Sequence, residues 1–236
     1  MILTIKNAIP TSLTDAALTD AARTDAARTD AAQPDDVAGR IVRRTLSKRE
    51  DQYVSEVRRL LDAALEVIRR CGTSSRPRVA DIVAEAGLSN DAFYRHFRSK
   101  DALVTVILED GGERLQSYLA HQMAKESMPA GQVRRWVQGV LAQADKDIAA
   151  TTLAVLWNAS ALGGGPAAGR HFASAPLSSL LREPFAALGS SVPELDAALA
   201  AHATLGMLSD CLWRQVQPTR GEVERVTTFC LGAAKG

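Results

Sequence analysis

Apolar residues recur at helical spacing through most of this chain, and the most compact case lies in its first half. A first short helix is predicted there from an apolar stripe that consists of Val79, Ile82, Val83 and Ala86. Gly87 follows this stripe and can adopt the left-handed conformation that ends a helix. We expect Leu88 to fill the corner, and Ser89 is a favourable N-cap for a second helix. Phe93 and Phe97 are four residues apart, so they predict the face with which this second helix packs.

Another helix is predicted just upstream, from an apolar series that ends at Gly72. Its members are Val57, Leu60, Leu61, Ala64, Leu65 and Ile68. Three short helices of this kind can share one small core and leave the outer face of the last helix free to enter a DNA groove. Residues 54–103 are therefore predicted to form a helix-turn-helix domain.

The remaining chain, residues 104–236, keeps a helical pattern and shows no alternation typical of strands. Helix-breaking residues divide it at Met128–Pro129, Gly163–Pro166, Ser191–Pro193 and Gln217–Pro218. The last two segments, around 195–212 and 223–230, carry more apolar surface than one packed face needs. These patterns predict an all-α fold in which a second helical domain follows the first.

Two N-terminal segments differ in composition from the rest. Residues 1–39 contain a five-residue Thr-Asp-Ala-Ala-X repeat from Thr14 to Gln33 and few large apolar side chains. Such a segment cannot offset its ordering entropy, so we predict a disordered tail. Residues 40–53 begin with RIVRRTLSKRE and are interpreted as a basic arm that lies along phosphates or enters a minor groove. A solvated run of charges is the alternative interpretation.

The distribution of charge agrees with DNA binding. The whole chain of 236 residues has a net charge of +1, yet residues 40–100 hold 14 Lys and Arg against 8 Asp and Glu. Basic charge concentrated on one domain is expected of a nucleic-acid-binding protein. No apolar run approaches the roughly 18 residues of a membrane span, and no secretory signal opens the chain. We therefore expect a cytoplasmic protein with no membrane association.

Three motifs carry the most specific signal, namely Ala86–Ser89, Phe93–Phe97 and Ser99–Leu103. Their order and spacing resemble the N-terminal domain of TetR-type transcriptional regulators, over residues 54–104. The resemblance implies a DNA-binding domain followed by a helical ligand-binding and dimerisation domain, residues 104–236. It also implies that the final two helices pair with those of a second copy as a four-helix bundle. Such a homodimer would present two helix-turn-helix DNA-binding domains, which we call reading heads, to a palindromic double-stranded DNA operator.

Eight residues are candidates for DNA contact: Arg78, Asn90, Asp91, Ala92, Tyr94, Arg95, His96 and Lys100. With both phenylalanines directed inward, the side chains expected to project outward are those of Asp91, Ala92, Tyr94 and Arg95. Asn90 can pair with adenine, and Asp91 can accept from a cytosine amine. Tyr94 and His96 are expected to donate to phosphate oxygens, beside the charge of Lys100. A core-edge position for His96 and a helix-terminal charge for Asp91 are the alternatives.

One departure from the TetR pattern concerns the first helix of the motif. Where the family often has a capping threonine pair, this chain has Pro77 and Arg78. The cap is therefore predicted to be missing, while a possible phosphate contact is gained at Arg78.

Residues suited to a small apolar or aromatic ligand are scattered through the second domain: Trp136, Trp157, His171, His202, Met207 and Cys211. Core packing explains each of them equally well. The histidines have neither a close nucleophile nor a second ligand at metal spacing, and the three cysteines form no CxxC pattern. We therefore expect no enzyme activity, no cofactor and no metal.

These patterns favour a ligand-responsive dimeric transcriptional regulator, acting as a repressor that a small molecule releases from its operator. Gly111 and Gly112 interrupt the segment that starts at Lys100, and they mark either a soft point that transmits ligand binding or the end of a helix. The alternative function is a helical sensor or interaction module whose degenerate reading head does not bind DNA. Asp91 and the missing cap suggest that alternative.

Overall fold

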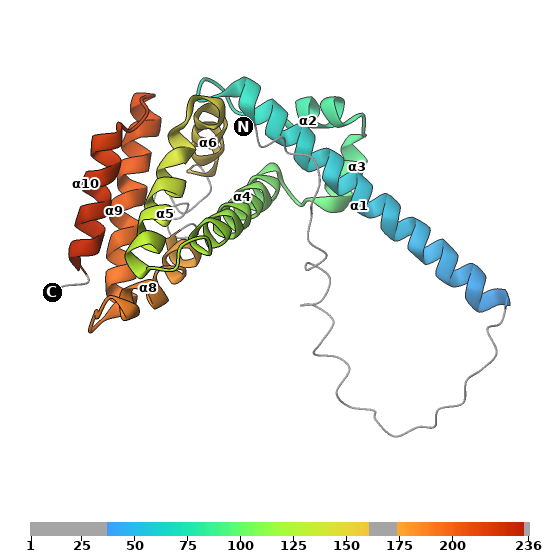
Figure 1. Cartoon of the computed structure of the whole chain (residues 1–236). Helices are drawn as coiled ribbons and strands as arrows, with labels where there is room; N and C mark the ends of the chain where they lie inside the picture. The colour runs from blue at the N-terminus through green and yellow to red at the C-terminus, as the bar shows by residue number, and fades with distance from the viewer. Residues whose placement is uncertain (1–36, 161–173, 234–236) are drawn as a thin grey trace, which may run out of the picture. The chain divides into compact units, whose positions relative to one another are not determined.

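The computed structural model describes residues 37–160 and 174–233, and over these ranges it is helical and contains no strand (Figure 1). The helices with defined bounds are α1 (Val37–Cys71), α2 (Val79–Ala86), α3 (Asn90–His96), α4 (Lys100–Met123), α5 (Pro129–Leu141), α6 (Lys146–Ala159), α8 (Arg182–Ala187), α9 (Pro193–Arg214) and α10 (Arg220–Ala233), with a short 3-10 turn at Ala142–Ala144. Residues 174–179 are helical as well. The predicted all-α fold is confirmed. None of these helices combines the length and apolar character needed to cross a bilayer. Most of the predicted tail and the break at 163–166 lie outside the described residues.

Helix α1 is longer than the apolar series predicts, because it begins at Val37 and spans 35 residues. The segment interpreted as an arm before the first helix is therefore itself helical. Residues 40–53 contain neither proline nor glycine, so no residue in this segment breaks a helix. The chain divides into two compact units at Glu50 and Asp51, and the described side chains of the first unit are almost all exposed. The helix ends before Gly72, as predicted, and Gly72 adopts the left-handed conformation with φ 55°.

The smaller of two apolar cores unites α1, α2, α3 and the first turns of α4. Its fully buried side chains include Leu60, Ala64, Ile68, Ile82, Phe93 and Leu103. Two alanines of α6, Ala154 and Ala159, also belong to this core. The predicted three-helix reading head is therefore present, and it shares apolar contacts with a helix from the later part of the chain.

The larger core is formed by α4, α5, α6, α8, α9 and α10, together with Ala144, Leu177 and Leu181 from the segments between them. Trp136 of α5 is fully buried in it and donates its indole N–H to the carbonyl oxygen of Leu177 at 3.0 Å. Gly139 allows α4 and α5 to approach closely, because a Cβ at this position would collide with the side chain of Leu119. This core thus has little room for added volume where α5 faces α4.

Helix α4 runs without interruption from Lys100 to Met123, through Gly111 and Gly112. The interpretation that a helix ends at this glycine pair is wrong. Two glycines cost about 2 kcal/mol in a helix interior, and apolar packing on both sides of the pair, through Ile107 and Leu119, offsets that cost. A soft point within the continuous helix stays a prediction.

Three of the predicted helix breaks are confirmed. Pro129 and Pro193 occupy the first turns of α5 and α9, where proline needs no amide partner. The third break, at Gln217–Pro218, lies between α9 and α10, and α9 ends at Gln215 in the left-handed conformation with φ 53°. Local turn chemistry therefore sets where these helices begin and end.

Candidate nucleic-acid interface

The turn between α2 and α3 is fixed by its backbone. Gly87 adopts φ 60°, and its N–H donates to the carbonyl of Ala84 at 3.2 Å. The N–H of Leu88 donates to the carbonyl of Val83 at 2.9 Å. Together these bonds form the left-handed C-cap that the sequence predicts, in the pattern that satisfies the last carbonyls of a helix.

Arg59 of α1 forms hydrogen bonds with the backbone carbonyl oxygens of this turn. Its Nε and Nη2 donate to the carbonyl oxygen of Ala86 at 3.1 and 2.6 Å, and Nη2 also donates to the carbonyl oxygen of Gly87 at 3.0 Å. A cation at the C-terminal end of a helix is favoured by the helix dipole as well as by these bonds. Arg59 therefore holds the turn, and with it the start of α3, against α1.

Helix α3 is anchored on its inner side. The hydroxyl oxygen of Ser89 accepts from the backbone N–H of Ala92 at 3.1 Å, which confirms the predicted N-cap. Phe93 is fully buried, and its ring lies 5.8 Å from that of Phe97, which is also buried. A helix of only seven residues is not stable alone, so these contacts hold it in place.

The outer face of α3 is polar and exposed. Asp91, Tyr94 and Arg95 are exposed to solvent, as predicted, and Asn90 is exposed at the first turn. Ala92 does not: it is 5% exposed and packs inward. The prediction for Ala92 is wrong because the buried side of α3 is broad enough to include the position before Phe93, so Ala92 cannot reach a base edge.

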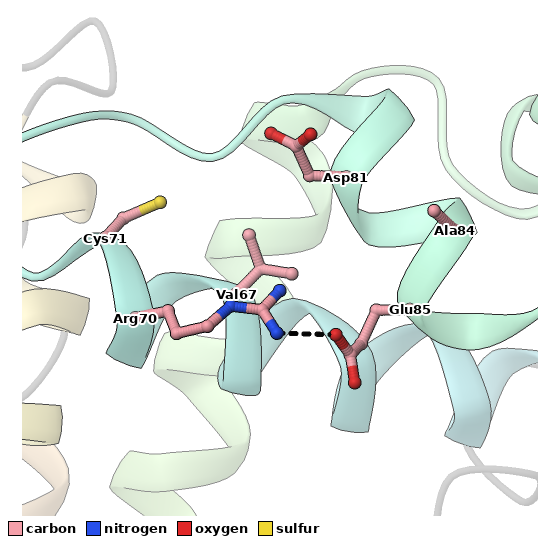
Figure 2. A pocket seen from close by; sticks show the side chains of 6 residues that line it. All are labelled: Val67, Arg70, Cys71, Asp81, Ala84 and Glu85. Atoms are coloured by element: carbon pink, nitrogen blue, oxygen red, sulfur yellow. Dashed lines mark hydrogen bonds and ion pairs between the residues drawn. The ribbon is translucent and has the colours of Figure 1, made fainter.

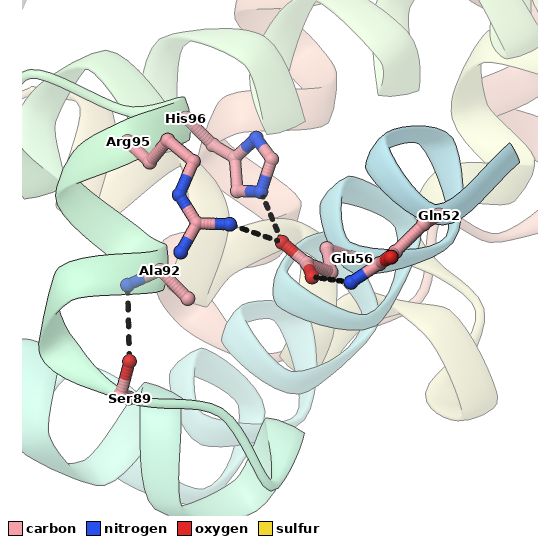
Figure 3. Close-up of polar contacts among 6 residues, drawn as sticks. All are labelled: Gln52, Glu56, Ser89, Ala92, Arg95 and His96. Carbon is pink, nitrogen blue, oxygen red and sulfur yellow. Dashed lines mark hydrogen bonds and ion pairs between the residues drawn. The ribbon is translucent and has the colours of Figure 1, made fainter. Parts of the chain in front are cut away.

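A buried carboxylate lies beneath the C-terminal half of this helix (Figure 3). Glu56 of α1 accepts from His96 Nε2 at 2.8 Å and from Arg95 Nη1 at 3.3 Å, both through Oε2. Its other oxygen, Oε1, accepts from the side-chain amide of Gln52 at 3.0 Å. The ring of Tyr53 packs edge-on against His96, with centroids 4.3 Å apart. We call Gln52, Tyr53, Glu56, Arg95 and His96 the Glu56 cluster.

This cluster overturns the phosphate contact predicted for His96. The His96 side chain is 1% exposed, so it lies at the edge of the core and cannot reach DNA. Because ionised Glu56 can only accept, His96 Nε2 carries the proton of this bond, while buried Nδ1 has no partner. The hydrogen bonds from His96 and then Gln52 hold the pKa of Glu56 below its ordinary value. Glu56 is thus a carboxylate at neutral pH.

Two basic candidates flank the recognition helix. Arg78 precedes α2, makes no capping bond there, and pairs with Asp81 at 3.3 Å while remaining largely exposed. The predicted absence of a cap is confirmed. Lys100 opens α4, whose N-cap Ser99 accepts from the N–H of Ala102 at 3.1 Å. The half-buried Lys100 therefore sits at a fixed helix start close in sequence to α3.

An open depression lies between α1 and α2 (Figure 2). It is lined by Val67, Arg70, Cys71, Asp81, Ala84 and Glu85. The ion pair between Arg70 and Glu85, 2.7 Å long, crosses it and ties the two helices together. Both partners are well exposed, so the pair contributes at most about 1 kcal/mol. The depression offers neither an enclosed volume nor a free charge, and we assign it no ligand.

The structure does not gather the six ligand candidates into one site. Trp136, Met207 and Cys211 belong to the larger core, where Met207 is only partly buried. Trp157 instead lies beneath the guanidinium of Arg76, 5.7 Å from its ring centroid. His202 is exposed and bonds through Nδ1 to the carbonyl of its own helix, so it lines no interior cavity of this chain. His171 lies outside the described residues.

Sequence reasoning missed Glu56 and Arg59. For Glu56 a signal exists, because it precedes Leu60 by four residues and so falls on the apolar stripe of α1. A carboxylate on a buried stripe requires a partner. Arg59 gives no such signal, since it lies off the stripe among other basic residues and its partners are backbone carbonyls 27 and 28 residues away.

Comparisons with known proteins agree with this geometry. Residues 60–107 match the sequence model of the bacterial regulatory proteins of the tetR family. A comparison with curated proteins finds no match. Among solved structures, a TetR-family transcriptional regulator from Mesorhizobium loti is similar with a TM-score of 0.60 and 15% identity, covering 77% of this chain and 96% of that one.

Two further solved structures are similar over most of their length. A TetR-family regulator from Streptomyces coelicolor has a TM-score of 0.53 and 20% identity, with 77% of this chain and 94% of that chain covered. RolR in complex with resorcinol has a TM-score of 0.54 and 16% identity, with 79% and 93% covered. At these identities the structures establish a shared fold. Residues 60–107 therefore carry the sequence pattern of the tetR family, and the chain shares the fold of solved TetR-family regulators.

Proposed function

We propose that this chain is a dimeric repressor of transcription that binds a palindromic operator through α3 and releases it when a small apolar or aromatic ligand binds. The observation that carries the proposal is the contrast between the two sides of α3. Its inner side is locked by Ser89, Phe93 and the Glu56 cluster, whereas its outer side is polar and exposed. A rigid helix with a free polar face is what reading of a major groove requires.

Roles on the outer face follow from residue chemistry. Asn90 lies at the first turn and is suited to adenine, and Asp91 is suited to the amine of cytosine. Tyr94 and Lys100 are suited to phosphate oxygens, as is the exposed Arg78. The excess of basic over acidic residues between 40 and 100 supplies the long-range attraction to DNA.

Dimerisation is supported by an exposed apolar face on α9 and α10. Leu195, Leu199 and Trp213 of α9 are each more than half exposed, and Phe229 of α10 is 64% exposed. Large apolar side chains in such a row indicate a protein partner. A second copy of this chain, joined with α9 and α10 of each protomer in a four-helix bundle, would cover them and bring two reading heads together.

Ligand response is supported by the position of α6. Ala154 and Ala159 of this helix belong to the core of the reading head, while Leu153 belongs to the larger core. A change in the larger core can therefore bias the reading head through one helix, provided that the ligand favours one arrangement. We propose that the ligand binds beside Trp136, Met207 and Cys211, and the resorcinol complex of RolR supports an aromatic compound.

Selection of bound sites from a pool of random duplex DNA tests this function. The proposal expects enrichment of a palindrome, binding that weakens as salt rises, and a protein of twice the monomer mass in solution. A folded protein that enriches no sequence and binds no duplex at low salt would instead support the helical interaction module, and would overturn the proposal.

A further inference from the structure

Arg95 is exposed on the recognition helix, yet it is not a free cation. Its side chain is 58% exposed, and its Nη1 lies 3.3 Å from Oε2 of Glu56. Glu56 itself is 11% exposed and cannot follow Arg95 outward, because His96 and Gln52 hold its carboxylate from the other sides. If Arg95 moves away from Glu56, the carboxylate loses this ion pair, so Arg95 is held close to Glu56.

The consequence for DNA binding is a matter of charge. A cation that neutralises a phosphate releases counterions and steepens the salt dependence of binding. The ion pair of Arg95 and Glu56 has no net charge, so it releases fewer counterions than a free arginine. A guanidinium has five N–H groups in a plane, however, and only one nitrogen of Arg95 faces Glu56. The other N–H groups remain available to base edges.

We propose that Glu56 is a specificity-determining positioning residue: it withholds Arg95 from phosphates and orients its free N–H groups toward base edges. This inference rests on the proposed function, since it assigns a role within the α3 interface. Glu56 touches no DNA in this account and acts through Arg95. The low pKa of Glu56, caused by its hydrogen bonds from His96 and Gln52, keeps the required negative charge in place at neutral pH.

A purely structural role for Glu56 makes different predictions. If the carboxylate only fastened α3 to α1, its loss would lower thermal stability and weaken binding to all duplexes in parallel. If it directs Arg95, its neutralisation frees a cation, which strengthens binding to unrelated DNA and weakens discrimination. The salt slope of binding and the preference for the selected duplex over unrelated DNA therefore distinguish the structural role from the positioning role, which affinity alone does not.

The test uses Glu56→Gln in the full-length chain, titrated with a selected duplex and a scrambled duplex of equal length over a salt series. Glu85→Gln is the matched control, because it removes the same charge from an exposed ion pair between α2 and α1. We expect the salt slope of Glu56→Gln on the scrambled duplex to steepen by about 0.9 relative to the control, and the preference for the selected duplex to fall about tenfold. In the Arg95→Ala background, Glu56→Gln should change neither quantity.

Several results would overturn the inference. Equal slopes and equal preferences for Glu56→Gln and Glu85→Gln would do so, as would an effect of Glu56→Gln that persists without Arg95. If Glu56→Gln does not fold, Arg95→Ala alone tests the inference. We expect this variant to lose its preference for the selected duplex while its salt slope stays within about 0.3 of wild type. A salt slope reduced by about one unit would show that Arg95 contacts a phosphate and would overturn the inference. If the wild-type protein binds no duplex, the proposed function fails together with the inference. If it binds and only these variants disagree, the inference fails alone.

Discussion

Helices α3 and α9 each leave one face exposed, but the two faces differ in chemistry. The exposed face of α3 is polar, and the helix is held from behind by rings, a cap and a buried carboxylate. The exposed face of α9 carries Leu195, Leu199 and Trp213, and alanines such as Ala197 and Ala201 fill the side toward the core. Binding through a polar face requires a partner whose polar groups match in position, and its affinity depends on salt. Binding through an apolar face depends mainly on the apolar area that is buried.

The comparison predicts that the largest effect arises on the apolar face. Leu199→Asp combined with Phe229→Asp should leave a folded monomer, because burial of each native side chain contributes about 1.5–3 kcal/mol per protomer. The dimer dissociation constant should rise at least about 100-fold, as measured by sedimentation equilibrium. Ser117→Asp, at an exposed position of α4, serves as the control and should remain dimeric. A double variant that dimerises like this control would remove α9 and α10 from the interface.

Substitutions on the polar side should separate affinity from sequence preference. Lys100→Ala should weaken binding to every duplex and flatten the salt slope by about one unit, because a phosphate contact carries no sequence information. Asn90→Ala should instead cost about 1–3 kcal/mol on the selected site alone. Titrations on selected and scrambled duplexes measure both. Interchanged outcomes, with altered site choice in Lys100→Ala and a uniform loss in Asn90→Ala, would show that the roles are reversed.

The glycine pair of α4 tests whether the helix that follows the reading head has a soft point. Gly111→Ala with Gly112→Ala should raise the free energy of unfolding by about 1–2 kcal/mol, because both positions are helical and have space for a Cβ. Amide hydrogen exchange around the pair should slow in the same variant. Gly139→Ala is the contrasting control and should destabilise, since its Cβ would collide with Leu119. Unchanged exchange at the pair would mean that α4 is uniformly rigid.

The smallest effect concerns acid. The pKa of Glu56 lies below its ordinary value of 4.5 in the folded protein, so this carboxylate stabilises the fold at pH above 4.5 and that contribution is lost as the pH falls through the lowered pKa. Urea unfolding of Glu56→Gln should therefore depend less on pH below 4.5 than unfolding of wild type. Glu85→Gln again provides the comparison. Parallel pH profiles for wild type and Glu56→Gln would rule out this contribution.

Much of the structure of the reading head could be predicted from residues that are close together in the sequence. Gly87 and Ser89 could be assigned from sequence because a left-handed C-cap and a side-chain N-cap depend on residues next to them in the chain. Phe93 and Phe97 defined the packed side of α3 for the same reason. Ala92 and His96 were misassigned, because two phenylalanines define a line along the helix and not the width of the buried side.

Contacts between distant residues could not be predicted. The bond from Glu56 to His96 joins residues 40 apart, and only the packing of α3 on α1 brings them together. The helical state of residues 40–53 was also missed, since a run of basic residues forms a helix or an extended arm with similar ease. The described ligand candidates do not all share one core for a third reason: helical periodicity shows that a side chain lies on a helix face but not which core that face joins.

We propose that α3, held in place on its buried side, reads DNA through its polar face. Equilibrium titration of the wild-type protein, on its selected duplex and on the scrambled duplex over a salt series, tests this most directly. We expect both affinities to fall as salt rises, and the selected site to bind at least about 10³-fold more tightly than the scrambled duplex at physiological salt. Equal affinities for the two duplexes, or affinities that do not depend on salt, would contradict it.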